Sequence, residues 1–326
     1  MDAGITELLN GNYLEAMRIF QKIVKANPND VEALNNLGIA LEKMGRHTDA
    51  VGIYDMALKI DPRRLDVMFN KAVSLSKTRD RKKALELYDE ILEIDPRHKG
   101  ALLNKGTLLG RLRRYDDAIY LFNRALQIYP DFIEALLSKA TAEELKGDPR
   151  AAVETLRRVS KIQDYSALHH RIGKILRRMA MLNDAITEFD RAIEMDPQNK
   201  DALRAKAYTL TRLKRYHESI NCYERLIELD IKDASAYNGI AWNYYKLKEC
   251  EKGIDYAVKA LAIDPIGPPY HDTHACLLAC LERYEEAMKS FEEVRKMDPG
   301  ESFLSKDVYE KVREIIENKK IEQKNN

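Results

Sequence analysis

Two histidines and two cysteines near the C-terminus could carry the chemistry of a metal site. His271, His274, Cys276 and Cys280 fall within ten residues of one another, and imidazole and thiolate groups are the ligands that zinc prefers. On a helix, side chains share a face only when they are three or four residues apart. The two histidines therefore lie on the side of the helix that packs against neighbouring helices. The two cysteines lie on a different side of the same helix, away from the histidines. We expect neither a metal ion nor any other cofactor.

A second group of residues could bind an anion. From Arg150 to Arg178 there are eight basic and two acidic residues, in a chain of net charge +1. The basic residues that helical spacing assigns to one exposed face are His170, Arg171, Lys174, Arg177, Arg178, Arg204 and Arg212. Like charges crowded on one face favour an anionic ligand. The alternative is a solvated helix surface.

Three aromatic residues, Tyr208, Trp242 and Tyr245, continue the same face. An aromatic ring beside arginines suits contact with a partner. Trp242 is the only tryptophan of the chain, and ordinary packing is the alternative for it. We predict that these rings contribute to the same binding surface as the basic residues.

Three asparagines recur at a fixed spacing. Asn36, Asn70 and Asn104 are each 34 residues apart, and Ser138 breaks the series. A carboxamide offers one acceptor and two donors, which complement a peptide bond. A column of them can hold an extended chain by its backbone. The alternative is that these asparagines bond to neighbouring helices.

The same spacing governs the prolines, which set the elements that must position these side chains. Pro28, Pro62, Pro96 and Pro130 are each 34 residues apart, and Pro197, Pro265 and Pro299 continue the series with two stops skipped. Each proline ends a helical pattern, since proline cannot continue a helix. A fixed period of this length indicates an array of stacked units.

Each unit reads as a hairpin of two short amphipathic helices. Small residues such as Gly38 and Ala50 stand at one fixed point on each helix, where the helices cross. A large side chain such as Tyr54 follows, and we expect it to fill the gap towards the next unit. In the eighth unit Ala257 replaces this large side chain. We expect a looser joint there.

The unit from Val31 to Arg64 resembles the tetratricopeptide repeat, because its signature places carry Leu34, Leu37, Gly38, Leu41, Ala50, Tyr54, Ala57 and Pro62. Nine such units are expected, near residues 1–30, 31–64, 65–98, 99–132, 133–165, 166–199, 200–233, 234–267 and 268–301. The resemblance implies an all-α, right-handed superhelical solenoid whose first helices line a concave groove. A helix over 302–318 is expected to cap the last unit, and 319–326 to form a frayed polar tail.

Composition narrows the class of protein. The chain is 45% hydrophobic and 33% charged, which is typical of a folded, helix-prone chain. The start MDAGITELLNGNY has neither the basic flank nor the apolar core of a signal peptide. No apolar run approaches the ~20 residues that span a bilayer. The four cysteines lie within helical patterns, so we expect reduced thiols in a cytoplasmic protein.

The motifs favour binding over catalysis. The sequence contains no glycine-rich phosphate loop, no Gly-x-Ser-x-Gly and no His-Glu-x-x-His. We therefore expect no enzyme, but a scaffold that binds an extended peptide or a partner surface in its groove. The basic segment favours an acidic or phosphorylated ligand at units six to eight. Single-stranded RNA is the alternative ligand, although the net charge is near zero and the aromatic residues do not recur in every unit.

Two family precedents bear on the partner. The asparagine column resembles the asparagine ladder in the repeats of the nucleocytoplasmic O-linked N-acetylglucosamine transferase. Repeat proteins that clamp the C-terminal carboxylate of chaperones carry a set of lysines, asparagines and an arginine over three consecutive units. That set does not occur here, so we do not expect a chaperone tail as partner. Membranes are not expected partners either.

Overall fold

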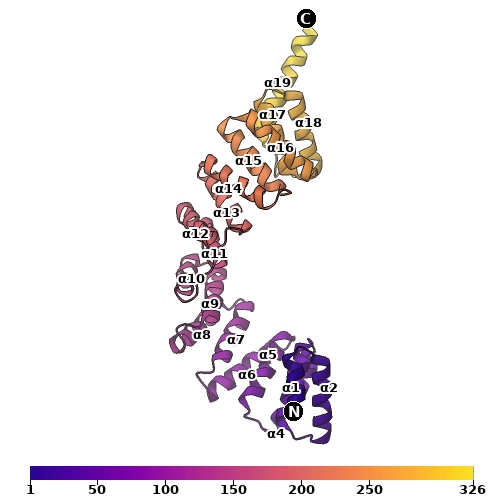
Figure 1. The fold of residues 1–326 in the computed structure, drawn as a ribbon, viewed down its shortest axis with the longest axis vertical. Helices are drawn as coiled ribbons and strands as arrows, with labels where there is room; N and C mark the ends of the chain where they lie inside the picture. The colour runs from indigo at the N-terminus through magenta and orange to yellow at the C-terminus, as the bar shows by residue number, and fades with distance from the viewer. Residues whose placement is uncertain (326) are drawn as a thin grey trace. The chain divides into compact units, whose positions relative to one another are not determined.

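The described residues, 1–325 of the computed structural model, form helices and no strand (Figure 1). The helices are α1 (Asp2–Leu9), α2 (Tyr13–Ala26), α3 (Val31–Lys43), α4 (His47–Ile60), α5 (Leu65–Lys77), α6 (Arg81–Ile94), α7 (Lys99–Arg111), α8 (Tyr115–Ile128), α9 (Ile133–Lys146), α10 (Pro149–Ile162), α11 (Ser166–Arg178), α12 (Leu182–Met195), α13 (Lys200–Arg212), α14 (Tyr216–Leu229), α15 (Ala234–Leu247), α16 (Cys250–Ile263), α17 (Pro268–Cys280), α18 (Tyr284–Met297) and α19 (Lys306–Asn325). The prediction of an all-α repeat solenoid is confirmed.

The helices group into two compact bodies. The N-terminal half, Met1–Gln163, contains the hairpins from α1 to α10, and the C-terminal half, from Asp164, contains those from α11 to α18 with α19. From α3 on, consecutive first helices within each half touch one another, and within each half a second helix packs between its own first helix and the next one. From the second hairpin on, every first helix begins at the residue where we expected a repeat to start.

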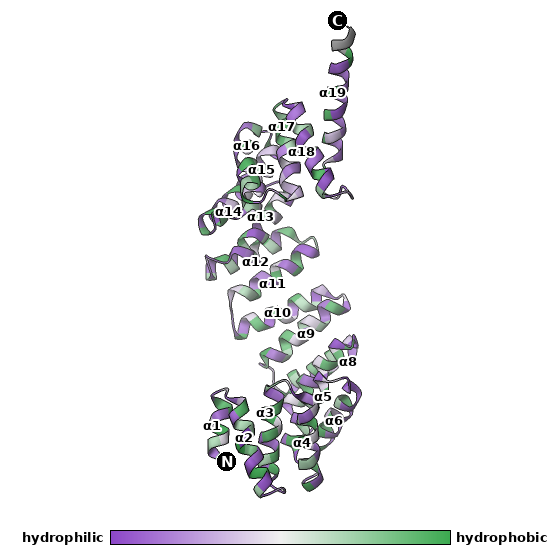
Figure 2. Cartoon of the chain, turned by 90° about the vertical axis from the view of Figure 1, so that its right-hand side faces the viewer, coloured by the Kyte–Doolittle hydropathy of each residue, from purple (hydrophilic) through white to green (hydrophobic). Residues whose placement is uncertain are grey.

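Local signals explain where the helices begin and end. The Asp30 carboxylate accepts a hydrogen bond from the Ala33 N–H and so caps α3, and Asp148 caps α10 in the same way. Pro149 then takes the first position of α10, where its missing N–H costs nothing. Figure 2 shows hydrophilic and hydrophobic residues alternating along the helices, as amphipathic helices require.

In several hairpins a large ring packs on a small residue of the first helix of the same hairpin. A Cβ added to Gly38 would lie 2.3 Å from the Tyr54 ring, and one added to Gly106 would lie 2.7 Å from the Phe122 ring. We expected these rings to fill the gap towards the following unit instead. Tyr223 does reach the next hairpin, since its ring lies against Gly239. The small residue is needed because the ring occupies the space of its side chain.

The eighth hairpin is filled by other side chains. Ala257 is fully buried, and Leu277 packs so closely on Gly253 that an added Cβ would lie 2.8 Å from its Cδ2. The Tyr256 ring lies 5.9 Å from the Tyr244 ring. Ala257 therefore lies in a packed cluster with Leu277, against which Tyr256 also packs.

The expectation of four reduced thiols is wrong. Cys250 and Cys280 form a disulfide, with their Cα atoms 6.3 Å apart, within the usual range. It joins the first residue of α16 to the last residue of α17. Cys222 and Cys276 are free and buried. The helical pattern placed all four cysteines on helices but did not indicate that these two helix ends lie side by side.

The last helix begins later and ends later than expected. It spans Lys306–Asn325 instead of 302–318, and so includes most of the expected tail, whose last residue, Asn326, lies outside the described residues. Its start is held by α17, because the two carboxylate oxygens of Asp272 accept hydrogen bonds of 2.7 Å each from the Ser305 N–H and hydroxyl. In the described part of the chain, no helix combines the length and the apolar character needed to cross a membrane.

Candidate functional site

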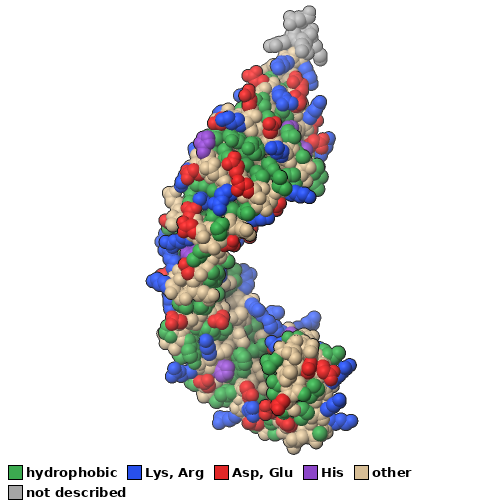
Figure 3. All heavy atoms as spheres, in the orientation of Figure 1, with side chains coloured by type: hydrophobic (Ala, Val, Ile, Leu, Met, Phe, Trp, Pro, Cys, Tyr) green, Lys and Arg blue, Asp and Glu red, His purple; other side chains and the backbone are tan. Residues whose placement is uncertain are grey.

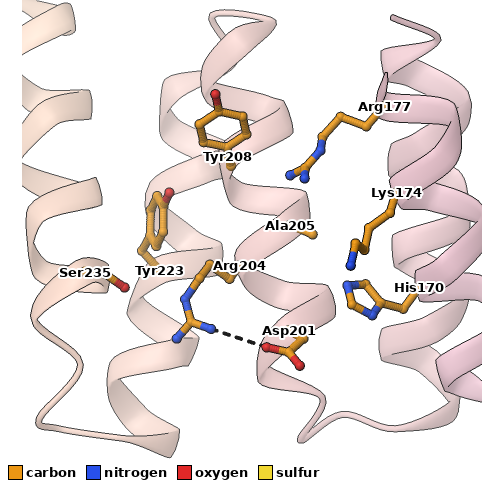
Figure 4. A pocket seen from close by; sticks show the side chains of 9 residues that line it. All are labelled: His170, Lys174, Arg177, Asp201, Arg204, Ala205, Tyr208, Tyr223 and Ser235. Carbon is orange, nitrogen blue, oxygen red and sulfur yellow. Dashed lines mark ion pairs between the residues drawn. The ribbon is translucent and has the colours of Figure 1, made fainter. Parts of the chain in front are cut away.

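An open cavity of about 600 Å³ lies in the C-terminal half, on the layer of first helices (Figure 4). Side chains from α11, α13, α14 and α15 line it, namely His170, Lys174, Arg177, Asp201, Arg204, Ala205, Tyr208, Tyr223 and Ser235. The structure thus brings together five of the residues predicted for this face, His170, Lys174, Arg177, Arg204 and Tyr208. Arg171, Arg178, Arg212, Trp242 and Tyr245 lie outside its lining.

The cavity exists because small residues stand where the N-terminal half carries asparagines. Ala205 and Gly239 stand at the repeat position of Asn36, Asn70 and Asn104, after Ser138 and Arg171. Ala205 lines the cavity directly. Gly239 allows the Tyr223 ring to lie against the backbone, since an added Cβ would be 2.4 Å from that ring. The buried Tyr223 ring therefore forms one wall.

The cations of the cavity fall into two classes. Arg204 is paired with carboxylates, because its guanidinium bonds to Asp233 and lies 3.6 Å from Asp201 Oδ1. Burial raises the pKa of Asp233, but hydrogen bonds from Ser235, the Ala236 N–H and Arg204 outweigh it and hold the pKa below its ordinary value. Asp233 thus stays ionised and holds Arg204 in place.

Lys174 and Arg177 form the second class. Neither has an ion pair with a described residue, and both extend from α11 towards α13 in Figure 4. The Arg177 Cζ lies 5.3 Å from the centroid of the Tyr208 ring, a distance typical of a cation–π contact. The Tyr208 side chain is 52% exposed. These two cations and the tyrosine ring are open to a ligand.

His170 contributes hydrogen-bonding capacity instead of charge. Burial lowers its pKa, with further lowering from Lys174 and Arg177 that the Asp201 carboxylate only partly offsets. The imidazole is therefore neutral at physiological pH. Two open cations, a neutral imidazole and a tyrosine ring can hold a carboxylate or a phosphate through charge-assisted hydrogen bonds.

The predicted aromatic residues lie further along the same layer. Trp242 and Tyr245 are half-buried on α15, with their ring centroids 5.4 Å apart. The Lys246 Nζ lies 4.2 Å from the Trp242 ring centroid. Both rings pack against the core of the last hairpin and α19. They combine packing with partial exposure.

The three asparagines bond across hairpin boundaries. The Asn70 Nδ2 donates to Asn35 Oδ1 at 3.0 Å, and the Asn36 Nδ2 lies 3.7 Å from the Met1 sulfur. Asn104 bonds to the Tyr88 hydroxyl of the preceding hairpin. All three remain half-buried. Part of their bonding capacity thus serves the array itself, and a grip on a peptide backbone stays a prediction.

The histidines and cysteines that raised a metal site serve other roles. His274 Nδ1 lies 3.0 Å from the Ser290 hydroxyl, and His271 Nε2 lies 2.9 Å from the Pro265 carbonyl. Cys276 is fully buried, and Cys280 is in the disulfide. Among the side chains that the structure describes, no three His, Cys, Asp or Glu residues gather to hold a metal ion.

Sequence reasoning missed the acidic members of the site. Asp201 lies three residues before Arg204 on the same helix, and this spacing could have revealed the pair. The replacement of asparagine by Ala205 could have indicated the cavity. Asp233 belongs to the loop before α15, and no local pattern connects it with Arg204.

Comparisons with known proteins agree with this architecture. Models of the tetratricopeptide repeat match residues 1–64, 69–131, 111–172 and 170–234. No match was found among curated proteins. A tetratricopeptide repeat protein from Parabacteroides merdae is similar in structure, with a TM-score of 0.52 and 16% identity over 73% of this chain and 95% of that one.

Two further solved structures are similar at lower scores. YrrB, described as a TPR protein with an unusual peptide-binding site, has a TM-score of 0.48 and 17% identity over 61% of this chain and 99% of its own. The TPR domain of P58(IPK) has a TM-score of 0.36 and 17% identity over 98% and 97%. Since the family models match more than half of the chain, it belongs to the tetratricopeptide repeat family.

Proposed function

We propose that this protein is an interaction scaffold whose C-terminal half binds an acidic or phosphorylated segment of a partner protein. The observation that carries the proposal is the pair Lys174 and Arg177, two cations that project into one cavity without a carboxylate partner among the described residues. Stacked repeats present extended surfaces of this kind to their partners. The segment would lie along the first helices, with its anionic group between α11 and α13.

The charges of the cavity favour a ligand with one or two negative charges. Lys174, Arg177 and Arg204 contribute three positive charges, and Asp201 and Asp233 contribute two negative charges. A carboxylate would neutralise the one positive charge that remains, and the charge of a phosphate would exceed it. The exposed face of Tyr208 can pack against the apolar part of the same ligand residue.

Fluorescence anisotropy tests the proposal with three labelled peptides of one length, which carry a central Asp-Glu pair, a phosphoserine, or serines alone. We expect the first two to bind and the third not to bind. Lys174→Glu with Arg177→Glu should remove binding. The control is Arg225→Glu with Lys289→Glu, which makes the same charge change on the exposed sides of α14 and α18. This control variant should still bind the acidic peptides. Binding should weaken with salt, because exposed charges are screened.

Two outcomes would overturn the proposal. Equal affinity for the acidic and the serine peptide would show that the cations do not select the ligand. Tighter binding of a labelled single-stranded oligonucleotide, lost in the Lys174→Glu, Arg177→Glu variant, would favour RNA instead. Circular dichroism of both variants checks that the helices remain.

A further inference from the structure

One position of the repeat changes its chemistry step by step along the C-terminal half. The position of Lys174 in α11 recurs every 34 residues as Tyr208, Trp242 and Cys276. The position of Arg177 recurs at the same spacing, and in α17 it is occupied by Ala279. The layer of first helices is thus cationic at α11, aromatic at α13 and α15, and apolar at α17. In Figure 3, hydrophobic side chains gather around the region of α15.

A second cavity, of about 480 Å³, lies at the apolar end of this layer. It opens between α15, α17 and α19, and we call it the C-terminal cavity. Its apolar walls come from Tyr245, Ala279, Tyr284, Val308, Val312 and Ile315. It occupies the same place between consecutive first helices as the cavity at Lys174, because α19 packs on α17 as a further first helix would.

Two features keep this cavity open. Ala279 is small, whereas the preceding hairpin carries Tyr245 at the same position. The hydrogen bonds from Ser305 to Asp272 fix the point at which α19 begins, so the side chains of α19 cannot slide to fill the space. A volume of this size is in the range of pockets that hold a bulky group.

The chemistry of the cavity suits an uncharged group. Its rim carries two cations, Lys248 and Lys311, and two carboxylates, Glu282 and Asp307, so its charges balance. The thiol of Cys276 lies in the wall, and burial raises its pKa to about 12. It is therefore a protonated thiol that packs like an apolar side chain, and not a nucleophile.

We propose that the C-terminal cavity takes a bulky apolar side chain of the same partner segment whose anionic group binds at Lys174 and Arg177. This inference rests on the proposed function. The two cavities are three first-helix steps apart, or roughly 30 Å at about 10 Å per step. An extended segment covers that distance in about nine residues. Trp242 lies on α15, between the two cavities, and can contact the intervening residues, whereas Tyr245 already belongs to the wall of the C-terminal cavity.

Synthetic fluorescein-labelled peptides test the proposal. Each carries an Asp-Glu pair at one end, a Leu or a Ser at the other, and a Gly-Ser spacer of about three to fifteen residues between them. We expect the Leu peptides to bind about tenfold more tightly than the Ser peptides, with a maximum near nine residues. Ala279→Trp, which fills the cavity, should remove the advantage of Leu and leave the affinity of the Ser peptides unchanged.

The outcomes separate the two proposals. If Leu and Ser peptides bind equally to the wild-type protein at every spacer length, the apolar subsite is refuted and the acidic site stands. If a Leu peptide in which two serines replace the Asp-Glu pair binds as tightly as the matching peptide with the pair, the acidic site is refuted.

A second readout does not depend on the acidic end or on the Ala279→Trp variant. The NMR methyl signals of Val308, Val312 and Ile315 should shift when N-acetyl-leucinamide is added. Unmoved methyl signals at saturating concentration would also refute the subsite.

Discussion

At the scale of single residues, a half-buried histidine should link stability to pH. Burial lowers the pKa of His274, with a further lowering from His271 and Arg283. Below the ordinary histidine pKa of about 6.5, the unfolded chain binds a proton more readily than the folded chain, so the free energy of unfolding falls as pH falls. We expect His274→Gln to reduce this loss, measured by urea unfolding between about pH 7.5 and 5.5. An unchanged pH dependence in the variant would contradict the assignment.

A second residue-scale prediction concerns the turn after α11. Ala180 has a φ of +60°, a left-handed conformation that Gly147 adopts in the preceding hairpin with a φ of +95°. A Cβ in this conformation costs about 1 kcal/mol. Ala180→Gly should therefore raise the free energy of unfolding by about 0.5–1 kcal/mol. Ala167→Gly, at an exposed helical position of the same hairpin, should lower it by up to about 1 kcal/mol. Equal changes in the free energy of unfolding for the two variants would contradict the left-handed conformation of Ala180.

At the scale of elements, two glycines of one hairpin should respond in opposite ways. A Cβ at Gly38 would lie 2.3 Å from the buried Tyr54 ring, whereas nothing lies within 4 Å of one at Gly52. Gly38→Ala should force α3 and α4 apart and destabilise the protein by about 1–3 kcal/mol. Gly52→Ala should stabilise it by up to about 1 kcal/mol, because alanine favours a helix. Denaturant titration of both variants measures the sign of the change in the free energy of unfolding.

The disulfide makes a further prediction for the last hairpins. It closes a loop between residues 30 apart in sequence. A disulfide that closes a loop of this length raises the free energy of unfolding by about 2–4 kcal/mol, because it limits the conformations of the unfolded chain. Cys250→Ser with Cys280→Ser should lower the melting temperature to a value that reducing agent no longer changes. Cys222→Ser, at a free cysteine, should leave the response to reducing agent intact. A wild-type protein unaffected by reduction would contradict the pairing.

The fold could be predicted from the sequence because each hairpin is determined locally. The prolines, the small residues and the large rings specify where a helix such as α3 or α7 begins and what it packs on. The period of the repeat was therefore enough to predict the order of the helices. The disulfide and the start of α19 could not be read, since both depend on contacts between hairpins, as between Asp272 and Ser305. The cations of the site were predicted for the same local reason. Asp233, which pairs with Arg204 and belongs to the next hairpin, was not predicted.

At the scale of the whole molecule, the chain divides between Gln163 and Asp164. The sequence carries a trace of this division, because the proline of the repeat is replaced there by Asp164-Tyr165 and the spacing shortens by one residue. In an array of repeats each hairpin is stabilised mainly by its neighbours. A division of the array is therefore a place where cooperative unfolding can separate.

We expect urea to unfold the protein in two transitions, one for each half. Gly38→Ala should shift only the transition of the N-terminal half, and reduction of the disulfide only that of the C-terminal half. Hydrogen exchange resolved by peptide assigns each transition to its residues. Because Lys174 and Arg177 lie in the C-terminal half, Gly38→Ala should lower stability without changing the affinity for the acidic peptide. A single transition that both changes shift, or a loss of peptide binding in Gly38→Ala, would mean that the halves fold and bind as one body.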